Sequence, residues 1–123
     1  MSYKNFWYVL IILLYFPVTG YSADISGVWS AAFDTQVGHQ DYTYEFTQKG
    51  SELTGSMKSG NGESKVENGK VEGDKVTFVE NLNYQGTSLK VDYTGKIISD
   101  DEISFTRQVG EFATEQLTAK RVK

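Results

Sequence analysis

Few residues in this sequence have the types and spacing that enzyme chemistry requires. The 123 residues include one histidine, His39, and no cysteine. Without a second histidine or a thiolate, a zinc site would have to rely on carboxylates, and no serine stands in the sequence context of a hydrolase nucleophile. His39 lies between Gly38 and Gln40, where a solvated loop histidine is expected. We therefore expect no enzyme activity, no metal site and no cofactor.

Two charged residues interrupt apolar patterns and are better candidates for a functional role. Residues two apart in a strand face the same side, and by this rule Glu80 and Arg107 share the inward face with aliphatic and phenylalanine side chains. Each follows an acidic turn residue, Asp74 or Asp101, at the same distance along the chain. We therefore expect Glu80 and Arg107 to lie at similar height and to face each other near one end of the fold.

Two interpretations of Glu80 and Arg107 remain open. In the first, they form an internal ion pair that satisfies itself, or a bulge turns one of them out to solvent. In the second, they form hydrogen bonds or ion pairs with a ligand that enters among aromatic and aliphatic side chains. The first arrangement is the more common in proteins, because buried charges are usually paired and fixed.

The elements that position these residues are short runs of alternating apolar and polar residues, separated by Gly, Asn, Asp and Ser. No proline occurs after Pro17, and the aromatic residues fall mostly in the inward register. Such alternation is typical of strands with one dry and one wet face. The runs are Gly27–Phe33, Tyr42–Lys49, Leu53–Lys58, Lys65–Val71, Lys75–Tyr84, Ser88–Gly95, Glu102–Val109 and Glu115–Arg121.

This order of runs predicts an all-β fold, an eight-stranded antiparallel up-and-down β-barrel. A two-sheet sandwich would show the same alternation, but the strand number and the consecutive hairpins favour closure. Short turns alternate with longer connections, so the three longer loops share one rim. In the fourth run the inward valines are five residues apart, which predicts a β-bulge near Asn68 and Gly69. The longer loops are expected at Asp34–Asp41, Ser59–Glu63 and Gly110–Thr114.

Residues 1–23 have the order of a secretory signal peptide. Lys4 precedes an apolar run that ends at Phe16, and Pro17 and small residues lead to Ala23. The apolar run has about eleven residues, well short of the roughly 20 that span a bilayer. We expect cleavage after Ala23 or within the three residues before it.

Residues 24–123 are then expected to form a single secreted domain, in the bacterial periplasm or outside the cell, with no membrane span after cleavage. The net charge of −4 becomes −5 without Lys4, which is the one charged residue in the removed segment. This acidity is spread along the chain and makes nucleic acid an unsuitable partner. We expect a monomer that depends on its core alone, because no disulfide can form.

The first run contains Gly27-Val28-Trp29, and the last contains Arg121. With these residues the chain resembles the calycin superfamily, which includes lipocalins, fatty-acid-binding proteins and avidins. The resemblance implies that Gly27 and Trp29 open the first strand and that Arg121 packs across the indole. These residues would close one end of the barrel through a cation-π contact. The tryptophans that avidins place around biotin are absent from residues 24–123.

The expected function is a non-enzymatic binding module for a small hydrophobic or amphipathic ligand at the open rim. Most aromatic residues point inward, so we expect a packed floor and a shallow rim pocket rather than a deep cavity. The alternative is a module that binds or inhibits another secreted protein through its rim loops, with Phe112 as the best contact residue. The candidate ligand-binding residues are Phe33, Tyr42, Tyr44, Glu80, Tyr84, Leu89, Arg107 and Phe112.

Overall fold

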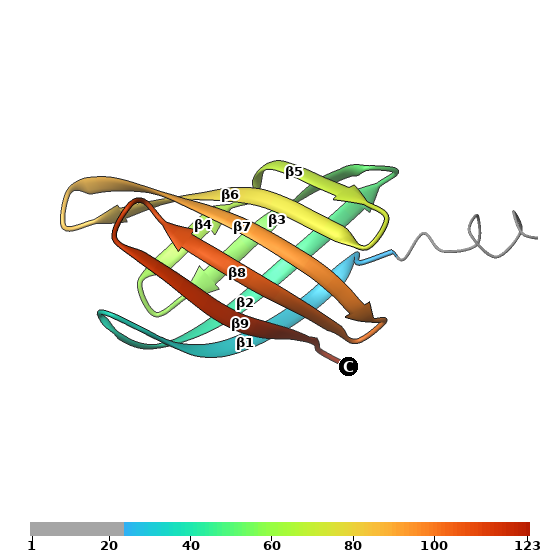
Figure 1. Ribbon diagram of the computed structural model, residues 1–123, viewed down its shortest axis with the longest axis horizontal. Helices are drawn as coiled ribbons and strands as arrows, with labels where there is room; N and C mark the ends of the chain where they lie inside the picture. The colour runs from blue at the N-terminus through green and yellow to red at the C-terminus, as the bar shows by residue number, and fades with distance from the viewer. Residues whose placement is uncertain (1–23) are drawn as a thin grey trace, which may run out of the picture.

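Antiparallel strands close into a barrel in the computed structural model, which describes residues 24–123 (Figure 1). The expected signal peptide, residues 1–23, lies outside the described residues. The strands are Gly27–Thr35 (β1), Gly38–Lys49 (β2), Glu52–Ser59 (β3), Gly62–Lys65 (β4), Glu67–Glu72 (β5), Lys75–Tyr84 (β6), Thr87–Ser99 (β7), Glu102–Val109 (β8) and Ala113–Arg121 (β9).

The ring runs β2-β1-β9-β8-β7-β6-β5-β3 and closes because β3 also pairs with β2. Each neighbouring pair in the ring is antiparallel, and most are consecutive in the chain. The predicted eight-stranded antiparallel barrel is therefore confirmed. β4 and β5 together occupy the place of the fourth predicted strand.

That fourth strand is interrupted at Val66. β5 pairs with β6 and with the start of β3, whereas β4 pairs with β3 alone. Between Glu67 and Lys70 the pairing shifts by one residue, and Asn68 has a φ of +51°. The bulge predicted near Asn68 and Gly69 is confirmed. As a result, the end of β6 beyond Val79 has no ladder partner on the side of β4.

The three connections predicted as long loops share one rim, as expected, but their predicted length is wrong. β1 and β2 pair continuously up to Thr35 and Gly38, so the connection is the two-residue turn at 36–37. The turns at 60–61 and 110–112 are similarly short. Together with the turn at 85–86, these four hairpin ends form one rim of the barrel, the hairpin rim, at the left of Figure 1. Near the hairpin tips the polar side chains are solvated, so the apolar alternation fades while the backbone ladder continues.

Aromatic rings pack the middle of the barrel. Phe78 and Tyr93 stack with ring centroids 4.3 Å apart, and Phe105 meets both rings edge-on. Tyr44 and Phe46 continue the cluster from β2. All five side chains are buried. The predicted packed floor is confirmed.

The end opposite the hairpin rim is closed by Trp29 and Arg121. The guanidinium of Arg121 lies 4.5 Å from the centroid of the Trp29 ring, and the indole Nε1 donates to the carbonyl of Ile25. Arg121 also donates to three backbone carbonyls, those of Asp24, Ser26 and Asp100. A Cβ on Gly27 would lie 3.0 Å from Arg121 Nη1, so a glycine fits this crossing. The predicted packing of Arg121 across the indole is confirmed.

Candidate functional site

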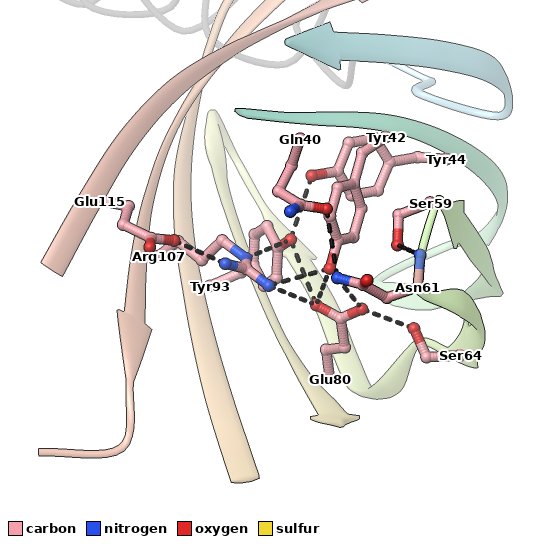
Figure 2. Close-up of polar contacts among 10 residues, drawn as sticks. All are labelled: Gln40, Tyr42, Tyr44, Ser59, Asn61, Ser64, Glu80, Tyr93, Arg107 and Glu115. Carbon is pink, nitrogen blue, oxygen red and sulfur yellow. Dashed lines mark hydrogen bonds and ion pairs between the residues drawn. The ribbon is translucent and has the colours of Figure 1, made fainter. Parts of the chain in front are cut away.

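A hydrogen-bonded network lies in the barrel interior near the hairpin rim (Figure 2). At its centre is the guanidinium of Arg107 on β8, which is 3% exposed. Its Nη2 donates to Glu80 Oε1 at 3.2 Å and to the hydroxyl of Tyr42 at 2.9 Å, and its Nε donates to the hydroxyl of Tyr93 at 2.8 Å. The predicted approach of Glu80 and Arg107 is therefore confirmed.

Both carboxylate oxygens of Glu80 are engaged inside the protein. Oε2 accepts hydrogen bonds from the hydroxyls of Ser64 on β4 and Tyr42 on β2, at 2.5 and 3.2 Å. The hydroxyl of Tyr93 lies 3.0 Å from that of Tyr44 and extends the network deeper. Among residues 24–123, no buried side-chain nitrogen or oxygen lacks a hydrogen-bond partner. For Glu80 this geometry favours the first interpretation, a self-satisfied ion pair.

Arg107 has a second acidic partner that faces the rim. Its Nη1 donates to Glu115 Oε1 on β9 at 2.5 Å, and the Glu115 side chain is 9% exposed. Figure 2 shows Arg107 between Glu115 on one side and Glu80 on the other. The three charged side chains therefore carry two carboxylates against one guanidinium.

The protonation states in this network follow from burial. Burial first, and then the charge of Glu80, raises the pKa of Tyr42 to about 12. Burial also raises the pKa of Tyr44 and of Tyr93 well above the ordinary tyrosine value. Burial alone would lower the pKa of Arg107, but the nearby oxygens of Tyr93, Tyr42 and Glu80 outweigh it and raise that pKa. At neutral pH the tyrosines are uncharged donors and the guanidinium is a permanent cation.

A cavity of about 380 Å³ opens at the hairpin rim, next to this network. Its inner end is formed by Tyr42, Arg107 and Glu115, so one face of the network borders the cavity. This volume is at the lower end of small-molecule sites, which measure about 300–1,000 Å³. The aliphatic walls come from Leu82, Leu89, Val109 and Ala113.

Some of the ligand-binding residues predicted from the sequence line the cavity. Those that line it are Tyr42, Leu89, Arg107 and Phe112. Phe33 instead packs beneath Tyr42, with ring centroids 5.4 Å apart, and Tyr44 and Glu80 are buried deeper in the interior. The side chain of Tyr84 lies outside the described part of the structure.

Several site residues were missed by the sequence reasoning, although parity could have found them. Glu115 stands two residues before Leu117, and Ser64 stands two residues before Val66, so each shares an inward register with a buried side chain. Gln40 precedes Tyr42 in the same way and lines the cavity, with its Oε1 3.3 Å from Asn61 Nδ2. Such positions are missed because the strand continues beyond the apolar residues that mark it in the sequence.

His39 lies in β2 and not in a loop, so its predicted placement is wrong. Its side chain is exposed, and Nδ1 lies 2.9 Å from Asp34 Oδ1 on the paired strand β1. The hydrogen bond with Asp34 raises the pKa of His39. Among residues 24–123, no group of three or more His, Cys, Asp or Glu side chains could hold a metal ion.

In comparisons with protein-family models, with curated proteins and with solved structures, nothing matches this chain. In the part of the chain that the structure describes, no helix is long and apolar enough to cross a membrane.

Proposed function

We propose that this chain is a secreted, non-enzymatic binding module that takes one small apolar or amphipathic molecule at the hairpin rim. The observation that carries the proposal is the 380 Å³ cavity, which has aliphatic walls and a few polar groups at its inner end. Concave apolar pockets with a few convergent polar groups are the usual form of small-molecule sites. The packed aromatic middle of the barrel restricts the ligand to the rim.

A neutral fluorescent dye, N-phenyl-1-naphthylamine, tests this proposal. The dye is expected to bind the purified protein with increased fluorescence, because the apolar walls exclude water from it. Ala113→Trp places a large ring in the cavity and is expected to weaken dye binding about tenfold or more, since the ligand would lose its contacts with the walls. Thr114→Trp is the matched control, because Thr114 is exposed and does not line the cavity.

The proposal fails if the dye does not bind, or if Ala113→Trp and Thr114→Trp bind it equally well. Thermal unfolding of both variants distinguishes a filled pocket from a disrupted fold. If the dye binds both variants as tightly as it binds the unaltered protein, its site lies elsewhere on the surface.

The second candidate function is a module for a secreted protein partner. Phe112 is 71% exposed and Val37 is 56% exposed, and they belong to the neighbouring β8–β9 and β1–β2 turns. The two turns are in contact, since Gln36 Nε2 lies 3.5 Å from the carbonyl of Phe112. Exposed apolar side chains on adjacent turns are suited to a protein contact. A partner recovered from culture supernatant by the unaltered protein, but not by Phe112→Ala, would support this candidate.

A further inference from the structure

We propose that the rim cavity prefers a cationic head group, so that its ligand is an apolar molecule with an ammonium group that pairs with Glu115. This inference rests on the proposed function and adds the charge of the ligand to it. Its first support is the charge count, since the buried cluster holds Glu80 and Glu115 against Arg107 alone. One bound cation would bring the cluster to neutrality.

The position of Glu115 is the second support. Among the side chains that line the cavity, the charged ones are Arg107 and Glu115. Glu115 Oε1 accepts from Arg107, whereas no described side chain donates to Oε2. The Glu115 side chain is 91% buried, and it lines a cavity with aliphatic walls. A hydrogen bond between an ammonium and a carboxylate is stronger in such a site than in water.

The engagement of Arg107 is the third support, because it disfavours an anionic head group. Its Nε, Nη1 and Nη2 already donate to Tyr93, Glu115 and Glu80. An anion that approached Arg107 from the cavity would also approach the Glu115 carboxylate, which lies against the same guanidinium.

Three ligands with one eight-carbon chain test the preference: octylammonium, octanol and octanoate. Each is titrated against the purified protein with bound N-phenyl-1-naphthylamine at pH 7, where the amine is charged and the acid is ionised. Octylammonium is expected to bind about tenfold more tightly than octanol, as measured by displacement of the dye. Octanoate is expected to bind more weakly than octanol. The ranking is measured on the unaltered protein, so it does not depend on the folding of any variant.

Glu115→Gln is expected to remove the advantage of octylammonium over octanol. Glu111→Gln is the matched control, because Glu111 is exposed in the turn before β9 and does not line the cavity. It makes the same change in net charge and is expected to leave the ranking intact. Equal loss of the preference in both variants would overturn the inference, since a general attraction to an acidic protein would then explain the ranking.

The outcomes separate this inference from the proposed function. If the dye does not bind, the proposed function fails. If the dye binds and octanoate or octanol displaces it as well as octylammonium does, the rim cavity binds ligands and the preference for a cation is overturned.

Discussion

Arg107 of β8 and Glu80 of β6 form an ion pair across the strand that separates them in the sheet. The distance from Nη2 to Oε1 is 3.2 Å, and both side chains are less than 5% exposed. The hydroxyl of Tyr93, from the intervening β7, receives a hydrogen bond from Arg107 Nε and lies 3.4 Å from Glu80 Oε1. Side-chain interactions in the barrel interior thus connect the three neighbouring strands β6, β7 and β8.

Replacing Arg107 with methionine is expected to lower the free energy of unfolding by about 3–5 kcal/mol, because the buried carboxylates of Glu80 and Glu115 would lose their cation. Urea unfolding followed by circular dichroism measures the loss. Lys90→Met is the control, since Lys90 is exposed and its pair with Asp92 is worth at most about 1 kcal/mol. Equal effects in the two variants would show that the buried pair contributes no more than a surface pair.

Stability is expected to fall as the pH rises above 10. The pKa of Tyr42 is about 12 in the folded protein, compared with the ordinary value of 10.0. The stabilisation is complete below pH 10 and is lost towards pH 12, because in that interval the unfolded chain releases a proton that the folded protein keeps. Each pKa unit corresponds to about 1.4 kcal/mol.

Tyr42→Phe removes this titration and is expected to make the fall in stability above pH 10 shallower. It does not abolish the fall, because Tyr44 and Tyr93 also have raised pKa values. Urea unfolding between pH 8 and 12, on the unaltered protein and the variant, gives both curves. A variant curve parallel to that of the unaltered protein contradicts the raised pKa of Tyr42.

The closed end depends on Arg121 through both its cation-π contact and its hydrogen bonds to backbone carbonyls. Arg121→Met is expected to reduce the free energy of unfolding by about 1–3 kcal/mol. Lys120→Met removes a cation from the next position, where the side chain is 62% exposed and pairs with Glu102 at the surface. This control is expected to change stability by less than about 1 kcal/mol, and a larger loss from Lys120→Met than from Arg121→Met would contradict the role of Arg121.

Two glycines provide a test of packing in the barrel wall. A Cβ on Gly95 would lie 2.4 Å from Cε1 of the buried Phe105, so Gly95→Ala is expected to destabilise the fold by about 1–3 kcal/mol through overpacking. At Gly60 an added Cβ meets nothing within 4 Å, and no positive φ opposes it, so Gly60→Ala is expected to be neutral or slightly stabilising. Thermal unfolding compares the two, and a neutral Gly95→Ala would mean that Phe105 moves aside.

The sequence alone determined which residues face inward. The two-residue period of a strand is a local property, so the alternation predicted the strands and the inward positions of Glu80 and Arg107, and its interruption predicted the bulge at Asn68. The closed barrel was inferred from the number of strands and the order of hairpins. The packing of Arg121 over Trp29 was expected from a resemblance in sequence and is present.

The tertiary structure decided where strands end and which charges meet. His39 and the residues around it are polar because the hairpin tips extend into water, so no apolar alternation marks them as strand. Glu115 completes the network because β9 lies beside β8, and the cavity exists because four hairpin ends surround its mouth. Such contacts depend on register between strands that are distant in the sequence, which no local pattern specifies.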